Sequence, residues 1–442
     1  MLLVHPILVL SVGLSNKHRP KNEFRQRMSR IFLIYRYCIR IYYKIVKVIE
    51  FIGNEVRELR GLLLFFMALN LAIVSGCAGD TSSLKDKEVS FSLNIGYFSQ
   101  KHFDDRYASL LALEYPNLHY TVVPTNDLVK GKVTLQEWMK NNKVDLIYLS
   151  GDDFREAAES GLLQKLDDDV ARDSFPLDTL IPGVVELTKH YGDGELYGLP
   201  PSFFSSAIVY NQQLFDQYGV EYPGNQMSWK DTIMLANRFP KGLTLPYPSA
   251  ADWLIDIGRT ESLRAYDEHT DRLTLDSPSW SKILKLVKEP LKRGNIAIND
   301  INQNAFITEN YAMAVVNYED FKVVEQQGSE IKWKLVTMPV SPGSPEISHH
   351  ISLEGLWAIP ANSTQTEAAW ELIRFFLSGK VAEWEYRSVY GFSSLADYIS
   401  LGNADKNIES FYMLQPSKEE NAVSEQAYNL INAYVDRMLS SE

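Results

Sequence analysis

The chain has 442 residues and a formal net charge of −12, and this charge is distributed unevenly along it. Residues 1–60 hold 12 Lys and Arg against 4 Asp and Glu, whereas residues 61–442 hold 32 against 52. The net charge of −20 over the larger part argues against binding to nucleic acid or to anionic membrane surfaces. The contrast between the two parts suggests that they have separate fates.

The first distinct segment is an apolar run, residues 62–74, that ends at Ser75-Gly76-Cys77. It is shorter than the roughly 20 residues that span a bilayer, and it has the length of a secretory signal core, about 7–15 residues. Residues 74–77 (Val-Ser-Gly-Cys) resemble the lipobox of bacterial lipoproteins. That resemblance implies lipid attachment to Cys77 and cleavage before it. The alternative is a buried helix with a chance cysteine, but the polar segment that follows is not typical of one.

We therefore expect residues 1–76 to be a basic N-terminal extension and lipoprotein signal peptide, and residues 77–87 to be a linker. The extension reads either as a membrane-surface helix or as upstream sequence outside the natural protein, and it is excluded from the fold prediction. Cleavage would remove Cys38, so the mature chain could form no internal disulfide. The part that remains exceeds the about 250–300 residues that one core usually holds, which predicts two lobes.

Strands and helices alternate in the first part of the mature chain. Strict alternation of apolar and polar residues predicts a strand at 89–97. The elements that follow are a helix at 104–115, a strand at 119–123, a helix at 134–142, a strand at 144–149 and a helix at 153–160. This order predicts right-handed βαβ units and a mainly parallel sheet. Ligands of such sheets bind beyond the carboxyl ends of the strands, which points to residues 98–100 and 150–153.

A second region begins with a predicted strand at 207–211. It continues with a helix at 228–239, a strand at 312–318, a helix at 364–377 and a C-terminal helix around 427–438. Two of these helices start with capping-box spacing, at Ser228 with Asp231 and at Thr364 with Glu367. The apolar stripes of the last two helices predict that they pack against the core.

Four segments share their order and spacing with one known family. Residues 144–168 form a strand, a polar loop and a G-x-L-x-x-L-D run, and residues 195–239 contain YGLP, YNQQLF and SWKD in order. Residues 306–321 contain an AM motif, and residues 356–384 contain AAW at the start of a helix. Together they resemble family 1 of the extracellular solute-binding proteins, the maltodextrin-binding-like receptors of ABC importers.

The resemblance implies an α/β fold of the two-lobed, periplasmic-binding-protein-like kind (type II), with hinge-connected lobes and a central ligand cleft. Lobe 1 would comprise residues 88–203 plus 355–396, and lobe 2 would comprise residues 204–354 plus 397–442. The chain would cross between them near 202–206, 352–355 and 396–402. It also implies a monomeric, lipid-anchored receptor on the extracytoplasmic face that delivers a solute to a membrane permease and is not an enzyme.

We expect the solute to be a sugar or oligosaccharide, held by aromatic rings and polar side chains. The candidate ligand-binding residues lie at strand ends and crossings: Tyr97, Phe98, Ser150, Asp152, Asp153, Ser202, Phe203, Asp252, Trp253, Tyr318, Glu319, Glu354 and Trp357. Asp152 falls on the acid of the family's pattern, whereas Leu149 and Asp153 replace its aromatic and basic residues, which argues against maltodextrin itself. Trp253 and Trp357 could instead be core residues, and the two aspartates could simply cap a helix.

Three other functions remain open from the sequence. Acidic cleft candidates would also suit a receptor for a peptide or a polyamine. A lipid-anchored glycoside hydrolase would need two carboxylates about 5–9.5 Å apart, and no pair stands out. A metal site would need clustered ligands, and His349 and His350, adjacent on a predicted strand, would point in opposite directions. We therefore predict no metal and no cofactor.

Overall fold

The computed structural model describes residues 91–267, 269–298, 305–386, 390–399, 406–419 and 423–440. All of them belong to one compact unit, Ser82–Glu442. The predicted signal peptide, Cys77 and the linker at 77–87 lie outside the described residues.

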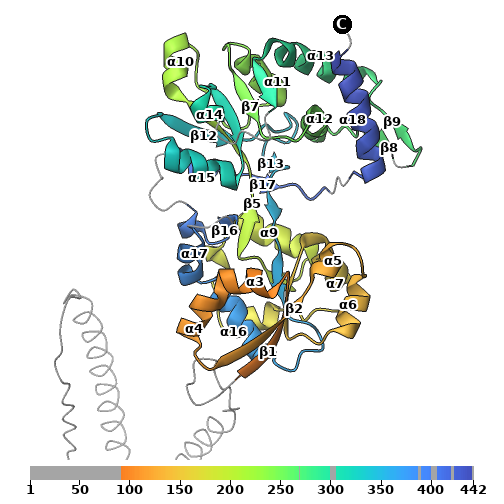
Figure 1. Cartoon of the computed structure of the whole chain (residues 1–442), viewed down its shortest axis with the longest axis vertical. Coiled ribbons are helices and arrows are strands. Elements are labelled where there is room, and N and C mark those ends of the chain that lie inside the picture. Colours follow the sequence, from red (N-terminus) through yellow and green to blue (C-terminus); the bar gives the residue numbers. More distant parts are fainter. Residues whose placement is uncertain are drawn as a thin grey trace, which may run out of the picture. The chain divides into compact units, whose positions relative to one another are not determined.

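Lobe 1 is built on a five-stranded sheet with the strand order β2-β1-β3-β15-β4 (Figure 1). Its strands are β1 (Phe91–Tyr97), β2 (Leu118–Pro124), β3 (Leu146–Leu149), β4 (Gly198–Leu199) and β15 (Leu356–Ala358). Strand β1 runs parallel to β2 and β3, as the alternation of strands and helices predicts. Strand β15 comes from much later in the chain and pairs antiparallel with β3 and β4, so the sheet is mixed.

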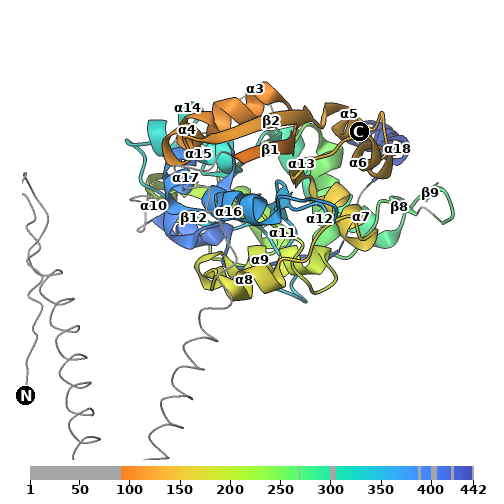
Figure 2. The same ribbon diagram turned by 90° about the horizontal axis from the view of Figure 1, so that it is seen from below.

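Helices cover both faces of this sheet (Figure 2). The main ones are α3 (Gln100–Phe103), α4 (Ser109–Glu114), α5 (Asn126–Val129), α6 (Leu135–Asn141), α7 (Gly151–Glu159), α8 (Asp167–Arg172), α9 (Pro182–Tyr191), α16 (Thr366–Phe376) and α17 (Gly379–Glu385). Side chains of α3, α4 and α16 share one hydrophobic cluster with β1. Those of α6, α7 and α9 share a second cluster with β3.

The first predicted helix, 104–115, is longer than expected and contains an irregular turn. It begins at Gln100 because the Ser99 side chain accepts a hydrogen bond from the His102 backbone N–H. Between α3 and α4 the segment η1 (Asp104–Ala108) is a π-helix. Two consecutive residues of this turn, Arg106 and Tyr107, are buried.

Lobe 2 has its own five-stranded sheet, with the order β10-β7-β11-β6-β12. The strands are β6 (Ala207–Asn211), β7 (Leu243–Leu245), β10 (Ile296–Ile298), β11 (Met313–Val316) and β12 (Trp333–Thr337). Its helices are α10 (Gln212–Tyr218), α11 (Trp229–Ala236), α12 (Ala250–Thr260), α13 (Pro278–Arg293), α14 (Ala305–Thr308), α15 (Tyr318–Gln327) and α18 (Glu425–Ser440). The predicted Ser228 cap of α11 is confirmed, whereas α16 has no side-chain cap, so the predicted capping box of Thr364 is wrong.

A small sheet joins the lobes, and we call it the crossing sheet. Its order is β14-β5-β16, from β5 (Ser202–Phe204), β14 (Ser352–Leu353) and β16 (Phe392–Ser393), all antiparallel. Beside it, β13 (Ile347–Ser348) pairs with β17 (Gln415–Pro416). In Figure 1 these strands lie between the two larger sheets. The two-lobed α/β architecture is confirmed. The lobe boundaries stay predictions, because β16 precedes the predicted third crossing and residues 400–402 are not among those described.

Candidate functional site

The strongest candidate site is a cavity on the crossing sheet, which we call the crossing cavity. Its volume is about 270 Å³, and it is lined by Phe204, Ser205, Ser206, Asn317, Tyr318, Glu319, His350 and Ser352. Phe204 is 43 % exposed, although its neighbour Phe203 is fully buried. Successive residues of a strand face opposite sides, so β5 directs one phenyl ring to the core and the other into the cavity.

A second cavity adjoins the first at Ser352, and we call it the interlobe cavity. Its volume is about 290 Å³. Lobe 1 contributes residues of α7 and α9 such as Asp152, Arg155 and Tyr191, whereas Arg259 comes from α12 in lobe 2. Arg155 pairs with Asp152 at 3.2 Å and lies over the Tyr191 ring at 5.0 Å.

A buried carboxylate in lobe 2 supports the histidine of the crossing cavity. Asp256 accepts hydrogen bonds from Trp229 Nε1 at 3.1 Å and from the Tyr247 hydroxyl at 2.8 Å. Its other oxygen lies 3.1 Å from His350 Nε2. Burial raises the pKa of Asp256, but His350 and the donors outweigh this effect and hold the pKa below its usual range. Asp256 is therefore a charged group in the core of lobe 2, and it lies beside the His350 ring.

The first turn of α15 also lines the crossing cavity. Its capping box pairs the Asn317 side chain with the Asp320 N–H at 3.0 Å, and Asp320 Oδ2 accepts the Asn317 N–H in return at 3.4 Å. Asp320 is only 2 % exposed. Burial raises its pKa to about 6, and the Asn317 N–H offsets part of this effect. The exposed Glu319 beside it supplies the carboxylate of the cavity.

Residues 119–396, more than half of the chain, match the family model described as bacterial extracellular solute-binding protein. The chain belongs to this family. Membership makes it a binding protein that acts outside the cytoplasm. Across the described residues, we find no helix with both the length and the apolar character required to cross a membrane.

Solved structures share the fold of this solute-binding protein. A family 1 extracellular solute-binding protein from Alicyclobacillus acidocaldarius is 15 % identical, with a TM-score of 0.59, over 80 % of this chain and 100 % of that one. The sugar-binding protein MalE from Xanthomonas citri is 15 % identical, with a TM-score of 0.56, over 79 % of this chain and 98 % of that one. The substrate-binding protein Lmo0181 from Listeria monocytogenes, in complex with cycloalternan, is 18 % identical, with a TM-score of 0.52, over 79 % of this chain and 94 % of that one.

Three of the residues that sequence reasoning selected line the cavities of this solute-binding protein. Tyr318 and Glu319 line the crossing cavity, and Asp152 lines the interlobe cavity. Tyr318 contributes mainly its edge, because it is 4 % exposed and packs against Phe392 at 4.8 Å. Phe98 lies at the end of β1, is 37 % exposed, and packs edge-on against His102.

Other selected aromatic residues belong to the core, and their predicted contact with solute does not fit this structure. Trp253 and Trp357 are fully buried, and Phe203 is equally inaccessible. Tyr97 stacks on Trp357 at 5.5 Å and is 6 % exposed. The physical reason is the period of the strands and helices, which turns these rings towards the apolar interior, where an aromatic side chain gains most from burial.

The remaining selected residues hold the local structure together. Ser150 caps α7 through the Asp153 N–H and also donates to the Asp153 carboxylate at 2.7 Å. Asp252 lies in the first turn of α12, where its carboxylate accepts a hydrogen bond from the capping Ser249 hydroxyl at 2.7 Å. Ser202 is buried and donates to Glu354 at 2.5 Å, so the two residues pair with each other and line neither cavity.

Sequence reasoning missed several residues that line the cavities. Phe204 lies within the first predicted crossing, but only Phe203 was selected as a ligand-binding residue, although the strict alternation of a strand leaves one of the two outside. Arg155 and Arg259 carried no signal, because charged residues on helices are usually solvated. His349 and His350 line different cavities, which agrees with side chains that point in opposite directions. The family pattern alone does not reveal which of these positions meet.

Proposed function

We propose that the chain is an extracytoplasmic receptor that binds a saccharide between its lobes and delivers it to the permease of an ABC transporter. The observation that carries this proposal is the exposed Phe204 ring in the crossing cavity, surrounded by hydroxyl, amide, carboxylate and imidazole groups. An aromatic ring covers the C–H face of a sugar, and the polar groups bind its hydroxyls.

The solved relatives support the same class of solute. The Listeria protein was determined with cycloalternan, and the Xanthomonas protein is described as sugar-binding. The mechanism would be closure of the two lobes around the solute, since a ligand that touches both lobes stabilises the closed state. The lobe boundaries that we propose are 88–203 plus 355–396 and 204–354 plus 397–442, and each large sheet falls within one of these sets.

The charges around the cavities favour a neutral solute over a polyamine. Among the described residues, the interlobe cavity is lined by two carboxylates, Asp152 and Glu419, and two guanidinium groups, Arg155 and Arg259. These charges balance, so a polycation would meet as much repulsion as attraction. The crossing cavity is lined by one carboxylate, Glu319, in the part of the chain that is described. A glycoside hydrolase needs two carboxylates, so this site gives that alternative no support.

A thermal-shift screen tests the proposal, with maltose, maltotriose, cycloalternan, spermidine and a tripeptide as probes. A ligand present at 100 times its dissociation constant adds about 2.7 kcal/mol of stability, which raises the melting temperature measurably. We expect a rise with at least one saccharide. A response to spermidine or the tripeptide alone would reject the saccharide class.

Substitution of Phe204 locates the binding site. Burial of a phenyl side chain contributes about 1.5–3 kcal/mol, so Phe204→Ala should weaken saccharide binding by roughly 10- to 150-fold in calorimetry. Tyr218→Ala is the matched control, because Tyr218, the last residue of α10, is exposed to a similar extent (45 %), packs against Phe239 and lines neither cavity. Equal affinity of both variants would mean that the solute does not contact Phe204.

We also propose that Cys77 carries the lipid anchor. The chain has two cysteines, which provides an internal control. In a bacterial host grown with labelled palmitate, Cys77→Ala should abolish labelling and leave the precursor uncut, whereas Cys38→Ala should leave both unchanged. Labelling that persists in Cys77→Ala would refute the anchor.

A further inference from the structure

Arg106 is a fully buried cation at the junction between lobe 1 and the crossing sheet. It is 1 % exposed. Its Nε donates to Glu385 Oε1 at 2.6 Å, its Nη2 donates to the Ser202 hydroxyl at 3.2 Å, and its Nη1 donates to the Tyr97 hydroxyl at 3.3 Å. These partners come from α17, β5 and β1. The guanidinium group therefore joins elements that are distant in the sequence.

The contacts of Arg106 reach all three strands of the crossing sheet. Ser202 begins β5. Glu354 directly follows β14, and its Oε2 accepts the Ser202 hydroxyl and lies 3.6 Å from Arg106 Nη1. The ring of Tyr390, two residues before β16, lies 4.5 Å from the guanidinium carbon. One side chain of lobe 1 thus contacts residues in or near each of the three strands of the crossing sheet.

Negative charges outnumber positive charges around the Arg106 guanidinium group. One guanidinium group faces two carboxylates, those of Glu385 and Glu354. Burial raises the pKa of Glu385, and Arg106 offsets part of that effect. Apolar side chains of similar volume often stabilise a core as well as a buried ion cluster does, so stability alone does not explain this arrangement. A planar guanidinium group, however, can hold several partners at fixed angles.

The backbone is adapted to bring Arg106 into this position. The π-helical turn η1 contains both Arg106 and Tyr107, and both side chains lie in the interior. The Tyr107 ring packs against Phe376 at 4.4 Å, so the turn is anchored in the core of lobe 1. Single π-turns inside α-helices occur frequently at functional sites.

We propose that Arg106 is a positioning residue of the hinge: it holds β5, β14 and β16 in place on lobe 1 and thereby sets how readily lobe 2 rotates. This inference rests on the proposed function in one respect, because rotation of the lobes is how the solute would be enclosed. Arg106, which lines neither cavity, would then control the balance between the open and closed states.

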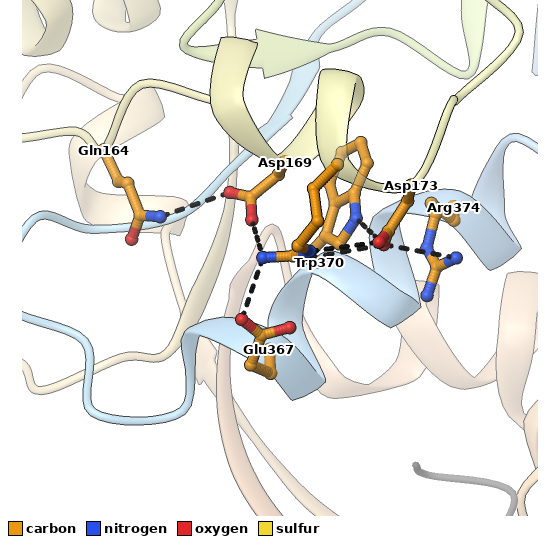
Figure 3. Close-up of polar contacts among 7 residues, drawn as sticks. Gln164, Asp169, Asp173, Glu367, Trp370 and Arg374 are labelled. Atoms are coloured by element: carbon orange, nitrogen blue, oxygen red, sulfur yellow. Dashed lines mark hydrogen bonds and ion pairs between the residues drawn. The ribbon is translucent and has the colours of Figure 1, made fainter. Parts of the chain in front are cut away.

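Lobe 1 offers a matched control in Arg172, which bonds to Asp169, Asp173 and Glu367. Figure 3 shows these three carboxylates together with Gln164, Trp370 and Arg374. Its distances are comparable, with Nη1 at 2.7 Å from Asp169 and Nε at 3.0 Å from Asp173. The Arg172 side chain is 44 % exposed. Asp169 lies on α8, Asp173 directly follows α8, and Glu367 lies on α16. None of them belongs to the crossing sheet.

Hydrogen–deuterium exchange of the full-length, solute-free chain tests the proposal with Arg106→Lys and Arg172→Lys. Lysine keeps the charge but cannot hold the same set of partners. In Arg106→Lys we expect exchange at 202–206, 352–355 and 390–394 to accelerate about tenfold, the change expected from losing one hydrogen bond to a charged group. Exchange in β6 and β12, which contain none of these partners of Arg106, should not change. Arg172→Lys should leave the three crossing segments unchanged.

Acceleration spread evenly over both lobes in Arg106→Lys would show a merely structural role and overturn the proposal, and so would no change at the crossing segments. If Arg106→Lys does not fold, Glu354→Gln decides, because it keeps the shape and an acceptor for Ser202 and removes one carboxylate from Arg106. It should alter exchange in the same three segments, and unaltered exchange would refute the proposal. No solute is present in these measurements, so the outcome is independent of the saccharide screen.

Discussion

The buried carboxylate of Asp320 predicts an unusual dependence of stability on pH. Asp320 lies under the turn of α15 that lines the crossing cavity, and its Oδ1 is buried without a hydrogen-bond partner among the described residues. The pKa of Asp320 is raised from 3.8 to about 6 in the folded chain. Because the raised value favours the protonated form in the fold, the stability that Asp320 contributes is complete below pH 3.8 and is lost as the pH rises through about 6.

The size of the effect follows from the pKa difference. About two pKa units correspond to about 3 kcal/mol, since one unit is worth 1.36 kcal/mol. Asp320→Asn keeps an oxygen that can accept the Asn317 N–H but removes the charge. We therefore expect the free energy of unfolding of Asp320→Asn, measured relative to the unmodified chain, to increase by about 2 kcal/mol between pH 4 and pH 7.5, because the carboxyl group in the unfolded chain is already partly ionised at pH 4.

Urea unfolding of the full-length chain at several pH values measures this difference. Asp231→Asn is the matched control, because Asp231 stands at the equivalent position of α11, three residues after the capping Ser228, but is exposed. The control reports how much pH dependence an exposed aspartate contributes at a helix N-terminus. A difference for Asp320→Asn that is constant with pH, or that falls as the pH rises, would refute the reasoning.

Two further predictions concern stability. Asp256→Asn should lower the free energy of unfolding by about 3 kcal/mol in urea titrations, because it removes a buried carboxylate that accepts hydrogen bonds from Trp229 and Tyr247 and lies 3.1 Å from His350 Nε2. A loss below about 1 kcal/mol would argue against a charged Asp256. Gly198→Ala should cost about 1–3 kcal/mol by overpacking, since its Cβ would lie 2.6 Å from Phe154 Cε2 and 2.7 Å from the Trp357 carbonyl oxygen. Gly224→Ala, where a Cβ would meet nothing within 4 Å, should be nearly neutral, and equal costs for the two would contradict the packing argument.

Local sequence patterns determined most of the individual elements. The strand predicted from the alternation around 89–97 and the helices predicted at 134–142 and 153–160 are present as β1, α6 and α7, and in the structure Thr134 and Ser150 cap the two helices. These features depend on a strand having two faces and on helix N-termini needing acceptors, and both are properties of neighbouring residues. The order of motifs also indicated the family, because it records the succession of elements along the chain.

The site itself was decided by tertiary structure. Phe203 and Phe204 are identical in chemistry, and only the register of β5 with β14 and β16 determines which ring is buried. Trp357 resembles a ligand-stacking residue in sequence but is enclosed by Tyr97 and Phe376. Burial depends on what the other side of an element packs against, and that is not encoded within the element.

By itself, then, the sequence determined that this protein has alternating strands and helices and the order of a two-lobed receptor. Only the tertiary structure brought Arg106 to Glu385, 279 residues away, and to Ser202, 96 residues away. The physical reason is the distance along the chain over which each interaction acts. Periodicity and capping act over a few residues, whereas a buried charge selects its partners by their position in space, and that position exists only once both lobes have folded.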